Sequence, residues 1–375
     1  MSLTRGEVRA ELIAKGWFTE PGAYVVVDGQ FGSTGKGLLS CILADVSTFG
    51  PRTTHVTSNQ GPNSGHTAYV PMFAGETKRI MLQQLPVAWV TQLILGKFVD
   101  GFQFPMCYLN GGAVIDPDIL RRELEEFAEG HHADFYIHPS AAIILEKHKL
   151  QEAKGSVAAV ASTGKGVGAA IASKILRENN TADQHWARLV QKKYQIGWVD
   201  WDWKQDVVFV EVPQGFSLGI NSGEFHPYTT SRECTVMQAI ADARIPAQKV
   251  RKVAACYRVY PIRVGNTADG YSGACYDDQR ELTWDQIGVP PEYTSVTGRM
   301  RRVFSWSREQ FRQSVAANRP DLIFVNFAQY MMEEEFERGF MPRLLKDYEA
   351  VMGRPPETVL VGTGPKNGDV RVWQL

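Results

Sequence analysis

The chain has 375 residues, of which 44% are hydrophobic and 22% charged, and its formal net charge is −1 at pH 7. These values exclude a disordered chain and give no global charge that would attract nucleic acid or an anionic membrane surface. No apolar run is long enough to span a membrane, and residues 1–22 lack the order of charged and apolar residues of a signal peptide. Five scattered cysteines without a CxxC pair favour reduced thiols, so we expect a cytoplasmic globular protein.

The predicted elements alternate along the chain. Residues 1–22 form an extension before the first strand, with helical spacing at Val8, Leu12 and Ile13, and no linker divides residues 1–375, which we expect to form a single domain. Strands are predicted at residues 24–28, 207–212, 322–327 and 358–361, and helices at 117–129, 234–242, 308–316 and 331–350. This order predicts an α/β fold with a mainly parallel central β-sheet flanked by helices, and ligands at the carboxyl ends of its strands.

The junction after the first predicted strand is the most informative segment. A β-branched run at residues 24–28 enters a glycine-rich loop at residues 29–37, and a helix is expected from about Leu38. Backbone amides of such a loop and the helix N-terminus suit a phosphate, and Lys36 adds a full positive charge. The spacing from Gly29 to Gly35 is one residue longer than in a standard P-loop, and Gly37 replaces its Ser or Thr. We predict a P-loop-related phosphate loop, and the spacing disfavours a generic P-loop NTPase.

Five further segments carry candidate binding chemistry. Residues 58–67 offer small polar side chains and His66, which could donate to a phosphoryl oxygen. The pentapeptide at residues 33–37 recurs at 162–166 before a helix expected to about Leu176; we interpret the two as independent anion loops, with duplication as the alternative. Residues 212–215 and 227–231 offer an amide and hydroxyls. Arginines alternate at residues 295–302, which suits a dicarboxylate, the alternative being a solvated basic turn.

Other patterns carry no predicted chemistry. The alternation of Trp and Asp at residues 198–203 predicts an edge strand or hairpin. His131, His132 and His138 lack the partners of a metal site and are expected in a solvated turn. Asp277 and Asp278 are expected in a surface turn.

Taken together and in this order, the loops resemble those of adenylosuccinate synthetases. That family has a Gln-Trp-Gly-Asp-Glu-Gly-Lys-Gly loop, then Asn-Ala-Gly-His-Thr, Thr-Thr-Gly-Arg-Gly-Ile-Gly, Gly-Ala-Gln-Gly, Thr-Thr-Gly-Arg-Arg-Arg-Arg and Ser-Thr-Gly-Pro. The corresponding segments here are residues 30–37, 63–67, 162–168, 212–215, 296–302 and 362–365. Each motif is weak alone, but their shared order spans nearly the whole chain after residue 22.

The resemblance implies a two-step ligase reaction. A nucleoside triphosphate phosphorylates O6 of a 6-oxopurine nucleotide, and the amino group of aspartate then displaces phosphate at C6. The family works with Mg²⁺ and as a homodimer. Catalysis of this kind is positioning plus neutralisation of charge.

The resemblance also assigns residues, all of them expectations at matching positions. The catalytic set is Ser33, Lys36, His66 and Gln214. The triphosphate set is Ser33, Thr34, Gly35, Lys36, Gly37, Gly65, His66, Thr67, Asn326, Gln329, Gly362, Thr363 and Gly364. The purine nucleotide set is Ser33, Asn63, Thr163, Gln214, Thr230 and Arg299, with Arg177 reaching the nucleotide of the partner subunit. The aspartate set is Val296, Thr297, Arg299 and Arg301, and the Mg²⁺ ligands are Ser33 and the Gly65 carbonyl.

One departure from the family pattern bears on the purine. Ser33 stands where the family has its presumed general base, an aspartate. This exchange resembles the phage-encoded branch of the family, which joins aspartate to dGMP to make N6-succino-2-amino-2′-deoxyadenylate. A shorter side chain would admit the 2-amino group of guanine and accept its hydrogen bond. The alternatives are a divergent adenylosuccinate synthetase that acts on IMP and a catalytically dead nucleotide-binding homologue.

A second departure concerns the phosphoryl donor. The family recognises the guanine of GTP with a Thr-Lys-x-Asp segment, whereas residues 325–328 here read Val-Asn-Phe-Ala. Ala328 has no carboxylate for guanine, so we expect ATP or dATP as donor.

Overall fold

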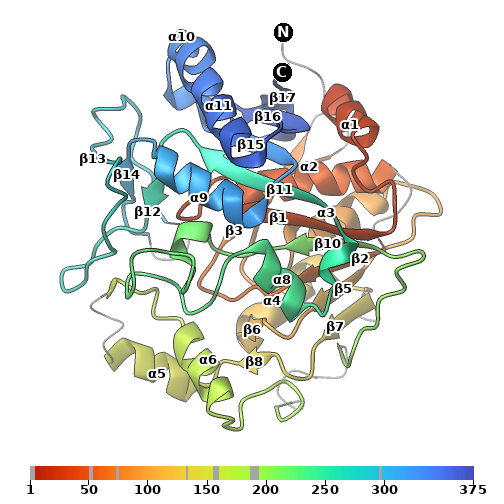
Figure 1. The fold of residues 1–375 in the computed structure, drawn as a ribbon. Helices are drawn as coiled ribbons and strands as arrows, with labels where there is room; N and C mark the ends of the chain where they lie inside the picture. The colour runs from red at the N-terminus through yellow and green to blue at the C-terminus, as the bar shows by residue number, and fades with distance from the viewer. Residues whose placement is uncertain are drawn as a thin grey trace.

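The structure is a computed structural model that describes residues 5–49, 54–72, 76–131, 134–154, 160–185, 194–294 and 298–375. A ten-stranded sheet runs through its centre (Figure 1). Its order is β17 (Val370–Val372), β16 (Thr358–Gly362), β15 (Leu322–Asn326), β11 (Val250–Arg258), β1 (Gly22–Asp28), β10 (Val207–Glu211), β2 (His55–Ser58), β5 (Met106–Leu109), β7 (Phe135–Ile137) and β9 (Gln195–Ile196). Every neighbouring pair is parallel except β16 with β17, so the predicted mainly parallel sheet is confirmed.

Helices cover both faces of this sheet, and each face has its own hydrophobic core. One core includes α1 (Arg5–Ala14), α2 (Lys36–Phe49), α3 (Val87–Gly96) and α4 (Pro117–Phe127). The other includes α8 (Val236–Asp242), α9 (Arg308–Asn318) and α11 (Met341–Met352). In β1, Tyr24 and Val26 belong to the first core and Val25 and Val27 to the second. Successive strand side chains point to opposite faces, so a strand covered on both sides becomes a continuous apolar run.

Shorter elements surround the sheet. Three small sheets pair β12 (Ile262–Arg263) and β13 (Glu281–Leu282) with β14 (Arg302–Phe304), β3 (His66–Pro71) with β4 (Thr77–Leu82), and β6 (Val114–Ile115) with β8 (Ala142–Ile143). α5 (Glu146–Lys154) and α6 (Val167–Ile175) lie together near β6 and β8, away from the central sheet (Figure 1). The short helical turns are α10 (Glu333–Glu335), the π-helical turn η7 (Phe336–Phe340), and η4 (Phe216–Leu218), η5 (Ala247–Lys249), η6 (Ala328–Tyr330) and η8 (Asn367–Asp369).

Most predicted elements are confirmed with small shifts at their ends. The helix expected in the first 22 residues is α1, in which Val8 and Leu12 are buried. The helix expected over 331–350 is instead α10, η7 and α11 in succession. Pro342 at the start of α11 lacks the N–H that would continue an unbroken α-helical ladder.

Two predictions were wrong. Residues 198–203 form no strand; Trp201 donates its indole N–H to the carbonyl of Ala243 at 2.9 Å and packs at the rim of the second core. His138 is buried rather than solvated, and its Nδ1 accepts the backbone N–H of Ser140. His131 is partly buried against Phe104, and His132 lies outside the described residues.

Other expectations are confirmed. Asp277 and Asp278 occupy an exposed turn, and Asp278 accepts the backbone N–H groups that open α9. All five cysteines are free thiols. Among the described residues, no helix is both long and apolar enough to cross a membrane.

Candidate functional site

The predicted site residues gather at one edge of the sheet. Six strands that are neighbours in the sheet, β16, β15, β11, β1, β10 and β2, end at this edge because all six are parallel. The carboxyl ends of parallel strands form the usual ligand edge of an open α/β sheet. The residues at or just after these ends are Gly362, Asn326, Arg258, Ser33, Gln214 and Asn63.

The phosphate loop is folded around the carboxylate of Asp28, the last residue of β1. This carboxylate accepts the backbone N–H of Gln30 at 2.9 Å, that of Gly32 at 3.2 Å and the hydroxyl of Thr34 at 2.5 Å. The Lys36 ammonium lies 3.2 Å away. Four donors occupy the acceptor positions of Asp28, which is therefore the anchor of the loop and a poor candidate for a base.

Lys36 and Gln214, both predicted to be catalytic, meet in the structure. Lys36 Nζ donates to the backbone carbonyl of Gln214 at 2.5 Å, and its side chain is only 6% exposed. Gln214 has a left-handed backbone, with φ 64°, and its Nε2 is buried without a hydrogen-bond partner among the described residues. A buried amide donor without a partner is costly unless a ligand accepts from it.

His66 lies beside a buried glutamate that the sequence did not indicate. Its Nδ1 is 3.9 Å from Glu211 Oε2, at the end of β10. Burial, together with the charge of Lys36, lowers the pKa of His66 to about 3, so the imidazole is neutral and can donate one N–H near neutral pH. Burial raises the pKa of Glu211 to about 7, although the backbone N–H groups of Val87 and Ala88 donate to it. Glu211 could have been predicted from the sequence as an acidic residue at the end of an otherwise apolar strand.

The hydroxyl and the backbone carbonyl of Ser33 each accept a hydrogen bond from an arginine. Its backbone has φ 58°, and its side chain is exposed toward the sheet edge. Arg301 Nη1 donates to its hydroxyl at 2.8 Å, and Arg258 Nη1 donates to its carbonyl oxygen at 3.2 Å. The structure thus joins Ser33 to Arg301, one of the arginines predicted to bind aspartate.

The residues predicted for the triphosphate also come together. Asn326 Nδ2 donates to the carbonyl of Thr34 at 3.4 Å. A Cβ on Gly35 would lie 2.0 Å from Asn326 Nδ2, and one on Gly362 would lie 2.3 Å from Asn326 Oδ1. Three segments distant in sequence therefore meet where only glycine fits. Gln329 and Thr363 are exposed nearby in the chain, and Gly65 is exposed at the start of β3.

The residues predicted for the purine nucleotide form two groups. Asn63 Nδ2 donates to Thr230 Oγ1 at 3.4 Å. Arg299 Nη2 donates to the carbonyls of Ala161 and Ser162, next to Thr163. Arg177 stands apart from both groups, exposed just after α6. Val296 and Thr297 lie outside the described residues.

The second copy of the pentapeptide does not offer a free anion site. The Glu152 carboxylate accepts the backbone N–H groups of Gly166 at 2.7 Å, Gly168 at 2.7 Å and Ala169 at 3.3 Å. The positive end of α6 is therefore occupied by an acid of the same chain. The second of the two independent anion loops that we predicted is therefore filled by a carboxylate of this chain at the start of α6, because the spacing that makes an anion site does not say which anion fills it.

The donors available for Mg²⁺ are neutral oxygens. Within the described part of the chain, no group of three or more His, Cys, Asp or Glu side chains could hold a metal ion. Ser33 and Gly65 are exposed residues, and the hydroxyl and carbonyl oxygens of Ser33 already accept N–H groups of Arg301 and Arg258. Mg²⁺ in phosphate sites takes few protein ligands and keeps phosphate oxygens and waters. The residues present therefore fit an ion that the triphosphate itself holds.

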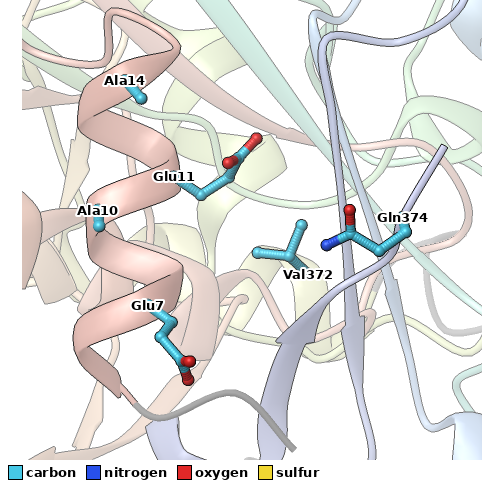
Figure 2. A pocket seen from close by; sticks show the side chains of 6 residues that line it. All are labelled: Glu7, Ala10, Glu11, Ala14, Val372 and Gln374. Carbon is cyan, nitrogen blue, oxygen red and sulfur yellow. The ribbon is translucent and has the colours of Figure 1, made fainter. Parts of the chain in front are cut away.

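A separate hollow of about 370 Å³ lies between α1 and the end of β17, at the opposite edge of the sheet (Figure 2). Glu7 and Glu11 line one wall, and Val372 and Gln374 line the other. Its acidic wall does not suit a nucleotide phosphate, so we do not assign it to the site.

A parallel sheet with a glycine-rich phosphate loop, a buried lysine and histidine, and arginines at the same edge defines an enzyme of nucleotide phosphoryl transfer. Comparison with known proteins makes the assignment specific. The family model for adenylosuccinate synthetase matches residues 25–196 and 181–331, and the chain belongs to this family.

Phage proteins and archaeal adenylosuccinate synthetases are both among the relatives of this chain. An N6-succino-2-amino-2′-deoxyadenylate synthase of Salmonella phage PMBT28 is 34% identical over 93% of this chain and 96% of its own. The adenylosuccinate synthetase of Pyrococcus horikoshii is 28% identical over 91% of this chain and 96% of its own. These matches confirm the resemblance that the motifs indicate.

Solved structures agree. The succinoaminodeoxyadenylate synthetase of Cyanophage S-2L, bound to dGMP and to dATP as an energy donor, superimposes with a TM-score of 0.78 at 31% identity, covering 94% of this chain and 95% of its own. Adenylosuccinate synthetase of Plasmodium falciparum has the same fold, with a TM-score of 0.66 at 17% identity, over 94% of this chain and 99% of its own.

Proposed function

We propose that this protein is a ligase that condenses dGMP with L-aspartate, driven by ATP or dATP, to give N6-succino-2-amino-2′-deoxyadenylate. The observation that carries the proposal is Ser33, a neutral residue in a phosphate loop that keeps its glycines and Lys36, and Arg301 donates to the Ser33 hydroxyl at 2.8 Å. The phage synthases support it, since they are 34–35% identical to this chain.

The reaction proceeds by activation and displacement. O6 of dGMP attacks the γ-phosphorus of the triphosphate; the bond to the nucleoside diphosphate breaks, and the N1 proton leaves. The aspartate amino group then attacks C6 of the 6-phosphoryl purine, and inorganic phosphate leaves with the bonding electrons. The first step is needed because a lactam oxygen is a poor leaving group until it carries phosphate.

The described residues can position and neutralise the charge of both steps. Lys36 lies at the start of α2, where its ammonium can move from Asp28 to a phosphate oxygen. The neutral imidazole of His66 can donate to the transferring phosphoryl group. Ser33 and the Gly65 carbonyl are the residues that would reach a Mg²⁺ ion held by the triphosphate, and such an ion would supply further neutralisation of phosphate charge. Arg299 and Arg301 suit the two carboxylates of aspartate.

The segment after β15 indicates which nucleotide is the phosphoryl donor. Ala328 is buried at the start of η6 and presents no carboxylate for guanine. In a panel of ATP, dATP and GTP with dGMP and aspartate held constant, we expect product with the two adenine donors. A strict requirement for GTP would refute this part of the proposal.

We extend the proposal to a homodimer located in the cytoplasm. Ile175 and Leu176 are each 72% exposed beside Arg177, an apolar end of α6 that suits cover by a second copy. Free cysteine thiols, most of them buried, suit a reducing compartment.

The direct test of the function is product analysis. Purified protein is incubated with dGMP, aspartate, ATP and Mg²⁺, and the succinylated nucleotide is sought by mass spectrometry. Omission of each component in turn is the control. Product that requires all the substrates supports the ligase, whereas binding of dGMP without turnover would support a dead nucleotide-binding homologue.

A further inference from the structure

We propose that Arg258 is a positioning residue that holds Ser33 in the conformation that selects a 2-aminopurine. The inference rests on the proposed function, since it concerns the purine that the same site accepts. Arg258 is the last residue of β11 and is fully buried, although an arginine is rarely buried without partners.

The guanidinium of Arg258 is fixed from three directions. It forms a two-pronged pair with Glu292, at 2.5 Å from Nη2 to Oε1 and 3.2 Å from Nη1 to Oε2. Its Nη1 also donates to the carbonyl of Ser33 at 3.2 Å. Its plane lies over the ring of Phe327, 3.9 Å from the centroid. A planar fork with this set of contacts cannot be replaced by lysine.

Ser33 needs such support because of its backbone. Its φ of 58° is unfavourable for a residue with a side chain, and such conformations persist only where neighbours enforce them. Arg258 holds the carbonyl side of Ser33, and Arg301 holds the hydroxyl side. The direction of the hydroxyl, which would meet the 2-amino group, thus depends on both arginines.

Glu292 connects the two arginines. Its carboxylate pairs with Arg258, and its backbone carbonyl accepts the N–H of Arg301 at 2.8 Å. Phe327, under the guanidinium, follows Asn326 on the donor side. Arg258 therefore contacts the segments proposed to bind the purine and the phosphoryl donor, and Glu292 joins it to the segment proposed to bind aspartate. Arg258 itself need not touch any of the three substrates.

The test compares two purines that differ only in the 2-amino group. The ratio of kcat/KM for dGMP to that for dIMP is measured for the wild type, R258K, E292Q, S33A and R258K/S33A. We expect R258K and S33A each to lower this ratio by up to about tenfold, the upper end of the scale for one lost hydrogen bond between neutral groups. The double variant should fall no further than S33A alone, because both changes remove the same contact.

The control is R308Q, which breaks another two-pronged pair, that of Arg308 with Asp347 between α9 and α11. It should leave the dGMP to dIMP ratio unchanged. E292Q keeps the size of the side chain and weakens the same pair of Arg258 with Glu292. It therefore tests the inference if R258K folds poorly, and it should also lower the dGMP to dIMP ratio.

Three outcomes count against the inference. An unchanged ratio in R258K and E292Q would assign Arg258 a purely structural role, even if the variants lost thermal stability. Independent, multiplicative effects of R258K and S33A would also overturn it. If the wild type makes no product from dGMP, the proposed function fails and the inference with it, whereas an active wild type with unchanged variants overturns the inference alone.

Discussion

In the proposed function Ser33 sets the purine substrate, but the sequence carries only part of the information that this role requires. Its identity is visible in the phosphate-loop motif, but its conformation depends on Arg258 and Arg301, which follow it by 225 and 268 positions. Local spacing predicts glycine-rich turns and Lys36 because these are properties of adjacent residues. It does not predict which distant side chain will cap a loop.

Ser33→Asp should lower kcat/KM for dGMP by about 10–100-fold, the range expected when a pocket loses a fitted contact and gains a clash. The new carboxylate would pair with Arg301 and occupy the space required by the 2-amino group. Steady-state kinetics with dGMP measure the effect. With dIMP as a parallel substrate, the loss should be smaller, and unchanged dGMP kinetics would contradict this account of Ser33.

Glu211 gives a prediction about pH. Its pKa in the folded protein is raised to about 7 by burial, above its ordinary value of 4.5. A raised pKa means that the folded protein favours the neutral carboxyl group of Glu211. The contribution of this neutral group to the stability of the fold is complete below pH 4.5 and is lost as the pH rises through 7. E211Q remains neutral, and it should gain roughly 3 kcal/mol relative to the wild type between pH 4.5 and 8.

Urea denaturation of both proteins across that pH range measures the difference. The comparison with the wild type is needed because buried histidines, whose pKa values are lowered, give the opposite trend in both proteins. A difference that does not change with pH would show that the pKa of Glu211 is not raised in the folded protein.

At the scale of elements, the loops at the sheet edge are packed against one another. A Cβ on Gly215 would lie 2.3 Å from the backbone N of Gly32 and 2.4 Å from the carbonyl of Gln30. The loop after β10 thus presses directly on the phosphate loop after β1. The phosphate loop cannot move away from Gly215 without disturbing its own hydrogen bonds to Asp28.

Gly215→Ala should therefore destabilise the protein by about 1–3 kcal/mol and weaken triphosphate binding. Gly368→Ala is the matched control, because a Cβ there would meet nothing within 4 Å, and its effect should stay within about 0.5 kcal/mol. Thermal unfolding with and without ATP reports both quantities. Equal behaviour of the two variants would contradict the tight packing of the two loops.

The elements themselves were predicted unevenly, for physical reasons. β1, β10, β15 and β16 are buried on both faces, and their apolar runs are visible in the sequence. β11 was missed because its first half carries charged residues and only its second half is buried. The Trp and Asp alternation at residues 198–203 has the period of a strand, but the structure assigns no strand to these residues.

In the proposed homodimer, we expect each active site to take residues from both subunits. If Arg177 acts at the partner's nucleotide, Lys36→Ala and Arg177→Ala should each be inactive alone. In a mixed dimer both defects fall in one site and the other site is intact. Mixing equal amounts of the two variants should thus restore about a quarter of wild-type activity if subunits exchange at random.

Analytical ultracentrifugation of the same samples checks that dimers form. Full inactivity of the mixture in spite of dimer formation would show that Arg177 serves its own subunit. The sequence suggested this role only through the family resemblance, and in the structure Arg177 is exposed just after α6.

A competition between dGMP and IMP tests directly whether this protein acts on a 2-aminopurine nucleotide. Both nucleotides are supplied at equal concentration with limiting enzyme, excess aspartate, ATP and Mg²⁺, and mass spectrometry follows both succinylated products. The account predicts N6-succino-2-amino-2′-deoxyadenylate as the dominant product. Dominant adenylosuccinate would contradict it and make the protein an adenylosuccinate synthetase in which Ser33 has another purpose.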